Sequence, residues 1–171
     1  MKKMFLSLLF VMATLMTAQA QKFALIDMEF ILKQIPSYEQ ANKQMENLSK
    51  KWQNEVEAKA KEAKALYEAY QKTASTMNAQ QRTAKEEEII NKEKEAAELR
   101  QTYFGPQGEA MKKRQELISP IRDAIYNAVK EIATQKGYDA VIDRASAQSM
   151  IYASPRIDIS NEVLSKLGYS K

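Results

Sequence analysis

The stretch from Ser37 to Tyr103 contains neither glycine nor proline and is rich in Ala, Lys, Glu and Gln. In its first half, apolar residues recur in steps of mostly three and four, the period of a helix with one apolar stripe. They are Met45, Leu48, Trp52, Val56, Ala60, Ala63, Leu66, Tyr67 and Tyr70. A helix over residues 37–72 would be a rod of roughly 55 Å, longer than a compact domain of this size is wide. We therefore expect it to project.

Capping and turn signals bound this rod. Ser37 and Gln40 form a Ser-x-x-Gln capping box just after a proline. The uncharged run over residues 73–81 is the best place for the chain to reverse, and Asn78 with Gln81 can cap the returning helix. Because an apolar stripe needs a partner, the two legs are predicted to form a long antiparallel helical hairpin. One continuous helix is the less favoured alternative, since residues 75–78 would weaken its middle.

Glycine and proline interrupt the helical pattern twice more. The sequence Gly105-Pro106-Gln107-Gly108 predicts a kink or short break, to which no role is assigned. Ser119-Pro120 predicts a second interruption, with one helix before it and another over residues 121–136. Gly137 is expected to end that helix as its C′ residue.

Short strands are expected at both ends of the mature chain. Residues 23–26 form an apolar run typical of a buried strand, and Asp27 can cap a short helix that stops before Pro36. Residues 138–143 and 149–153 predict a β-hairpin with a loop over residues 144–148.

A last helix over residues 161–167 would be capped by Ser160 or Asp158 and stopped by Gly168. Three short strands hide too little apolar area for a core of their own. Either the helices cover the sheet, or copies of the chain pool their strands.

The first twenty residues have the three parts of a cleaved signal peptide. Lys2 and Lys3 precede an apolar core, and the segment ends in Ala18-Gln19-Ala20. We expect cleavage after Ala20 and export from the cytoplasm, with a membrane anchor as the weaker alternative. No lipobox cysteine is present, so the mature protein should not be lipid-anchored.

The composition argues against an enzyme. The chain has no histidine and no cysteine, which removes the commonest general base, thiolate chemistry and the usual metal ligands. No cofactor or metal site is expected, and Glu86-Glu87-Glu88 is interpreted as a solvated helix face. Without the two leader lysines the chain has 24 basic and 22 acidic residues, a net charge of +2. Since these charges are interleaved, no nucleic-acid partner is expected.

The mature chain resembles the Skp/OmpH family of periplasmic chaperones. The resemblance rests on KFALIDMEFILKQIPSY, the long Lys/Glu/Ala arm, and the carboxy-terminal GYDAVID and MIYASPRIDISNEVLSKL. It implies a homotrimer in which strands of three subunits form a small β-barrel body. It also implies three helical arms around a cavity that holds unfolded outer-membrane proteins without ATP. Anionic lipid or lipopolysaccharide is a further candidate partner.

These considerations give a mainly α protein with a small β body. Residues 1–20 are the signal peptide, residues 21–36 and 119–171 the oligomerisation body, and residues 37–118 the hairpin arm. The predicted client contacts are Trp52, Tyr67, Tyr70 and Met77, although Trp52 and Tyr70 fit the hairpin seam as well. The predicted core of the body and subunit interface is Leu25, Ile26, Val141, Ile142, Ile151 and Tyr152. The alternative function is a periplasmic coiled-coil adaptor, whose larger β domains this chain has little room for.

Overall fold

The structure is a computed structural model that describes residues 21–147 and 149–169. The predicted signal peptide and its cleavage site lie outside the described residues. The chain divides into two compact units, one made of the residues up to Ile31 together with those from Asn127 onward, and the other of Leu32–Tyr126. Most of the described chain is helical, and none of the helices in it is long and apolar enough to cross a membrane.

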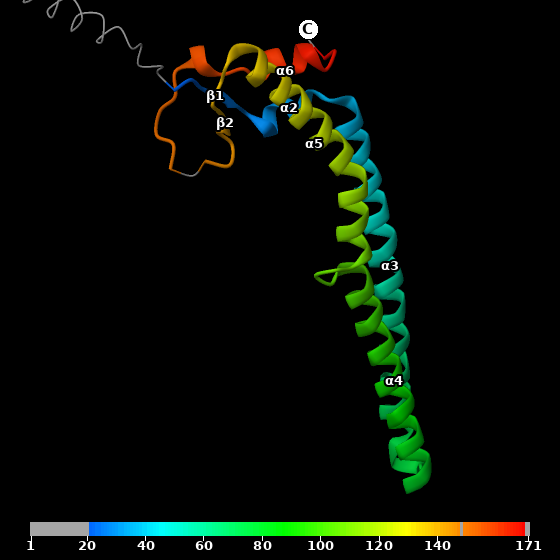
Figure 1. Ribbon diagram of the computed structural model, residues 1–171. Helices are drawn as coiled ribbons and strands as arrows, with labels where there is room; N and C mark the ends of the chain where they lie inside the picture. Colours follow the sequence, from blue (N-terminus) through cyan, green and yellow to red (C-terminus); the bar gives the residue numbers. More distant parts are fainter. Residues whose placement is uncertain (1–20, 148, 170–171) are drawn as a thin grey trace, which may run out of the picture. The chain divides into compact units, whose positions relative to one another are not determined.

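The unit Leu32–Tyr126 is dominated by a helical hairpin. Helix α3 (Pro36–Thr73) and helix α4 (Ala79–Phe104) lie side by side in opposite directions, joined by the 3-10 turn η1 (Ala74–Thr76) (Figure 1). At about 1.5 Å per residue, the 38 residues of α3 span roughly 57 Å. The predicted long antiparallel hairpin is therefore confirmed.

The turn at the tip is fixed by the predicted cap. The backbone N–H of Gln81 donates to the Asn78 side chain at 2.9 Å, and the backbone N–H of Asn78 donates to the Gln81 side chain at 3.0 Å. This reciprocal capping box satisfies two amides that the first turn of α4 would otherwise leave unpaired. The guanidinium of Arg82 also donates to the Met77 carbonyl oxygen.

The capping box predicted at Ser37 is wrong. Helix α3 begins one residue earlier, at Pro36, and its N-cap residue Ile35 makes no side-chain capping hydrogen bond. Proline suits the first helical position because its φ is already helical and it has no N–H to satisfy. The side chain of Ile35 is buried, so packing takes the place of a polar cap.

The predicted break after α4 is present, and it requires glycine. Helix α4 ends at Phe104, the N–H of Gly108 donates to the Gly105 carbonyl at 2.9 Å, and α5 (Glu109–Lys136) follows. A Cβ atom on Gly108 would lie 2.7 Å from the backbone oxygen of Tyr103. Only glycine allows the turn to pass this close to the end of α4.

The second predicted interruption is wrong, because α5 runs through Pro120 without a break. Proline inside a helix removes one hydrogen bond and costs about 3 kcal/mol relative to alanine. Ile118 and Ile125 are buried two turns apart on one face of this helix, while Pro120 is exposed. Burial of this face on both sides of the proline offsets the cost, and α5 ends as expected before Gly137, whose φ is +66°.

The other unit contains a small parallel sheet. Strand β1 (Phe23–Ile26) pairs with β2 (Ala140–Asp143), with Leu25 opposite Ile142. On its other side β1 forms a bridge to Asp158, where the N–H of Ile159 donates to the Leu25 carbonyl at 2.8 Å. β1 is therefore central, which explains why its last three residues are buried.

Two short helices and one 3-10 turn complete this part of the chain. Helix α2 (Met28–Gln34) is capped by Asp27, as predicted, since the N–H of Phe30 donates to its carboxylate at 2.8 Å. The turn η2 (Pro155–Ile157) leads into α6 (Ser160–Lys166), and Gly168 follows with φ of +83°. The buried apolar residues of this unit are Ala24, Leu25, Ile26, Ile31, Ala128, Ile132, Ile159, Val163 and Leu164.

The predicted β-hairpin of residues 138–143 with residues 149–153 is wrong for the single chain. β2 pairs in parallel with β1, and residues 149–153 form no strand. A strand needs a neighbouring edge to which its backbone can hydrogen-bond. Instead of returning along β2, the chain crosses to the far side of β1, where Asp158 forms a parallel bridge with Leu25.

Candidate functional site

The seam between α3 and α4 is narrow and built largely from small side chains. Its buried residues are Val56 and Ala63 on α3 and Ile89 and Ala96 on α4. The rest of α4 is mostly exposed, with Ile90 at 60%. A seam of this kind buries little apolar area per turn. Polar contacts along its edges therefore help to hold the two helices in register.

An aromatic cluster closes the seam where α4 ends. The rings of Trp52 and Tyr103 stack with their centroids 5.3 Å apart, and Phe104 meets Trp52 edge-on at 6.4 Å. Trp52 is half-buried, whereas Phe104 is 42% exposed. Trp52 was predicted on the apolar stripe of the first helix and Tyr103 and Phe104 on the returning helix, but the contact between them depends on the register of the hairpin and was not predicted.

Two tyrosine–glutamate hydrogen bonds cross the seam. Tyr103 on α4 donates to Glu55 on α3, and Tyr70 on α3 donates to Glu86 on α4. Each bond raises the pKa of its tyrosine, mainly because the hydrogen bond stabilises the protonated phenol, and further because loss of the phenolic proton would set two negative charges against each other. Tyr70 is therefore held at the edge of the seam.

The charged residues of the arm pair mostly along their own helix. Lys59 is an exception that reaches Glu95 across the seam at 3.4 Å, and Lys92 contacts the same carboxylate at 3.0 Å. The hydrogen bond to Lys92 is the main reason that the pKa of Glu95 is lowered. Glu86, Glu87 and Glu88 are all exposed, but Glu86 accepts from Tyr70 across the seam, so the predicted solvated face holds for Glu87 and Glu88 only.

An open hollow of about 480 Å³ lies between α3 and α4. Its floor is formed by Val56 and four alanines, and Tyr67 stands at its edge with 47% of its surface exposed. The remaining lining residues are Lys64, Glu93, Arg100 and Gln101. Of the four predicted client contacts, Tyr67 alone lines this hollow, while Met77 lies half-buried at the tip.

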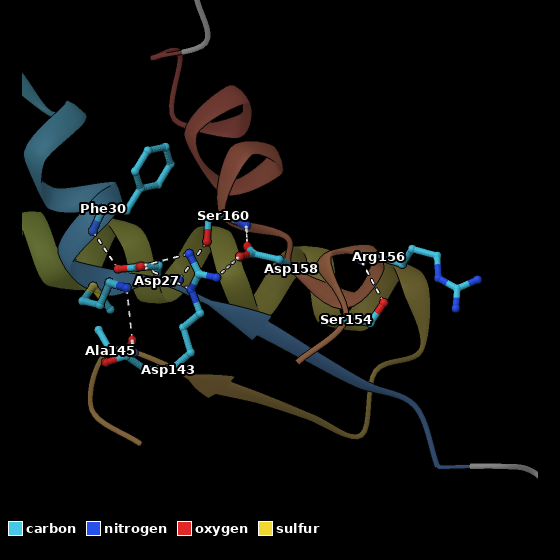
Figure 2. Close-up of polar contacts among 10 residues, drawn as sticks. Asp27, Phe30, Asp143, Ala145, Ser154, Arg156, Asp158 and Ser160 are labelled. Carbon is cyan, nitrogen blue, oxygen red and sulfur yellow. Dashed lines mark hydrogen bonds and ion pairs between the residues drawn. The ribbon is translucent and has the colours of Figure 1, made fainter. Parts of the chain in front are cut away.

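A polar cluster ties together the carboxyl ends of the two strands. The guanidinium of Arg144 contacts Asp27 at 3.1 Å and Asp158 at 3.3 Å. The hydroxyl of Ser160 accepts from the N–H of Asp27 at 2.8 Å, and Asp158 accepts from the N–H of Ser160 at 2.9 Å. Figure 2 shows Asp27, Asp158 and Ser160 converging at this point.

Asp143 extends the same cluster from the end of β2. Its carboxylate accepts from the N–H groups of Met28 and Ala145, at 3.1 and 3.0 Å (Figure 2). Together these contacts join segments more than 110 residues apart in the chain. Because the carboxylates are occupied by backbone amides and one arginine, the cluster is built for holding the strands rather than for chemistry. Among the described residues no group of acidic side chains is arranged to hold a metal ion.

The six residues predicted for the body core and subunit interface fall into two groups. Leu25 and Ile26 are buried, and Val141 is half-buried. Ile142 is 43% exposed, Ile151 fully exposed and Tyr152 81% exposed. Within one chain the last three therefore lie outside the core.

Comparisons with known proteins agree on one family. The model of the family described as outer membrane protein (OmpH-like) matches residues 22–167. The chaperone protein Skp of Yersinia enterocolitica is 31% identical over 153 residues, 88% of each chain. The chaperone protein Skp of Photorhabdus luminescens is 30% identical over 171 residues, 98% of this chain and 99% of the relative. These relatives are chaperones rather than enzymes.

A crystal structure of an OmpH-like outer membrane chaperone from Caulobacter crescentus has a similar fold. The TM-score is 0.66, and the match covers 86% of this chain and 84% of the other. The two sequences are only 11% identical, so the likeness concerns the fold alone.

Proposed function

Because the chain belongs to the OmpH-like family, we propose that it is an ATP-independent holdase chaperone of the periplasm. Its clients are unfolded outer-membrane proteins, which it keeps soluble by holding them between helical arms. The location follows from the leader sequence, whose removal after Ala20 would release the mature chain into the periplasm.

The main support for this proposal is the exposure of aromatic residues on the hairpin arm. Tyr67 and Phe104 each expose more than two-fifths of their surface on helices whose other exposed residues are mostly charged. A holdase must bind apolar segments at many weak points, so that affinity comes from their number and release needs no energy source. Trp52, Tyr70 and Met77 are assigned supporting contacts at the edges of the same hairpin.

The apolar surface of the body supports a homotrimer. Phe23 and Ile142 lie on the same face of the sheet, because β1 and β2 are in register, and both are more than two-fifths exposed. Ile151 and Tyr152 add two further exposed apolar side chains. Surface of this kind is normally covered by a partner. Three copies that pool their strands in a small barrel would bury it.

Suppression of aggregation tests the function directly. A urea-unfolded outer-membrane β-barrel protein is diluted into buffer with and without the mature protein, in the absence of nucleotide, and turbidity is followed. The proposal expects the client to stay soluble at about one oligomer per client. Unchanged aggregation at a several-fold excess of the protein would contradict it.

A further inference from the structure

The hollow on the hairpin arm has the properties of a docking groove for one side chain of an extended peptide. Its volume of about 480 Å³ falls within the range of roughly 300–1,000 Å³ that is usual for ligand pockets. Ala60, Ala63, Ala96 and Ala97 come from both helices and leave the space open. Ala63 and Ala96 are buried in the seam, whereas Ala60 and Ala97 stay exposed.

Aromatic residues bound the groove at its two ends. Tyr67 lines it on α3, towards the tip. Trp52 precedes the lining residue Val56 by four positions, and Phe104 follows the lining residue Arg100 by four, so both lie one turn beyond the groove. An extended apolar segment crossing the hollow would therefore meet an aromatic ring on either side.

The rim of the groove carries an excess of positive charge. It contains Lys64 and Arg100 against the single acid Glu93. Lys64 is already 3.8 Å from Glu68. In the described part of the chain Arg100 takes part in no ion pair, although most of the basic residues on this hairpin do. Its guanidinium is therefore available for a carboxylate from outside the chain.

The geometry points to this groove as a client-docking site that takes a large apolar side chain, aromatic or leucine, next to an aspartate or glutamate of an unfolded polypeptide. The apolar side chain fills the hollow over the alanines, and the neighbouring carboxylate pairs with Arg100. The inference rests on the proposed holdase function and names the client sequence that the arm prefers.

Short labelled peptides test the preference. Three fluorescein-labelled 12-residue peptides are compared by anisotropy with the mature protein: Phe-Leu-Phe flanked by Asp, Phe-Leu-Phe flanked by Lys, and Ser-Gly-Ser flanked by Asp. We expect the first to bind about two- to fivefold more tightly than the second, as for one exposed ion pair, and the third to bind most weakly. Equal affinities for the three peptides, or no binding of any, would contradict the proposal that the groove docks client.

Two sets of variants assign the preference to the groove. Ala60→Gln with Ala97→Gln fills the hollow with polar atoms and should weaken binding of the Asp-flanked Phe-Leu-Phe peptide about fivefold or more. Ala58→Gln with Ala84→Gln is the matched control at exposed alanines of the same helices that do not line the hollow, and should leave binding unchanged. Equal losses from both pairs would contradict the groove.

Arg100→Gln gives an independent test that leaves the alanines untouched. It should abolish the preference for Asp over Lys flanks while the Lys-flanked peptide binds as before. Lys61→Gln removes an exposed charge outside the hollow and should preserve the preference. If the preference survives Arg100→Gln, the proposed carboxylate contact is absent.

A photocrosslinker and an aggregation assay separate this inference from the holdase function. Benzoylphenylalanine placed at Lys64 should crosslink to the client peptide, and a crosslink to a second copy without peptide would assign the groove to self-association instead. In the aggregation assay, a wild-type protein that fails to protect the client contradicts the function itself. If the protein protects the client but the alanine-to-glutamine and Arg100→Gln variants bind the peptides as the wild type does, only the proposed docking site is contradicted.

Discussion

Tyr103 on α4 donates its phenolic hydrogen to the carboxylate of Glu55 on α3, 48 residues earlier in the chain. Tyr70 and Glu86 make the reciprocal bond nearer the tip, with the tyrosine on α3 and the acid on α4. The two bonds hold the helices at fixed points on either side of the open groove. The pairing explains how an arm with so few buried residues keeps one register.

The titration of these tyrosines gives a first prediction. The pKa values of Tyr70 and Tyr103 are raised above the usual value of about 10 by their glutamate partners. A raised folded-state pKa adds stability that is complete below the unfolded-state pKa and disappears as the pH rises through the folded-state value. The seam should therefore be intact at neutral pH and weaken above about pH 10.

Ultraviolet absorbance of tyrosinate measures this directly. Two of the eight tyrosines should ionise at a higher pH than the rest, and Tyr70→Phe with Tyr103→Phe should remove that late fraction. Trp52 is the only tryptophan of the chain and stacks on Tyr103, so its emission should shift to the red as the seam opens. A single uniform tyrosine titration would show that the two bonds do not form.

Gly108→Ala should destabilise the arm by about 1–3 kcal/mol. The added Cβ would stand 2.7 Å from the backbone oxygen of Tyr103, which the end of α4 cannot relieve without moving. Urea unfolding followed by Trp52 fluorescence measures the change. Gln107→Ala, at an exposed position of the same turn, should leave the unfolding free energy within about 0.5 kcal/mol, and an equal effect of both substitutions would refute the steric argument.

Arg144→Met should lower the unfolding free energy by about 1–2 kcal/mol, because it leaves Asp27 and Asp158 without their shared cation. Arg156→Met is the matched control, since the side chain of Arg156 is exposed and its only hydrogen bond shown in Figure 2 comes from its backbone N–H. Thermal unfolding by circular dichroism compares the two variants. Identical shifts of the melting temperature would mean that the cluster adds nothing specific.

Ile142→Asp should dissociate the proposed trimer and leave the fold of each chain intact, because Ile142 is exposed in the single chain and the new carboxylate would be desolvated only at a subunit interface. Ile90→Asp, at a 60% exposed residue of the arm, should leave the oligomer unchanged. Sedimentation velocity gives the mass, and circular dichroism gives the fold. An unchanged oligomer after Ile142→Asp would remove β2 from the interface.

The parts of the fold that local chemistry decides could be predicted from the sequence. The reversal at the arm tip follows from an uncharged run and the Asn78–Gln81 pair, and the break after Phe104 follows from two glycines and a proline. The start of α3 was misplaced because proline at the first helical position competes with a serine cap. Pro120 was misread because burial of Ile118 and Ile125, which a local signal does not show, keeps α5 continuous.

The sites were harder to predict than the helices. The stripe of α3 identified Trp52 and Tyr70, but their partners on α4 depend on the register of the hairpin, which the sequence does not state. The hollow was not predicted, because the alanines fit the apolar stripe of a packed seam although their small side chains leave space between the helices. The hairpin predicted for residues 138–143 and 149–153 failed because the chain after β2 returns to the far side of β1, at Asp158, rather than to β2.

The most direct test of the account is the mass of the mature protein by light scattering, with and without an unfolded outer-membrane protein. We predict a species of three times the chain mass that takes up one client and keeps it soluble. A monomer whose mass does not change when the client is added would contradict both the trimer and the holdase function.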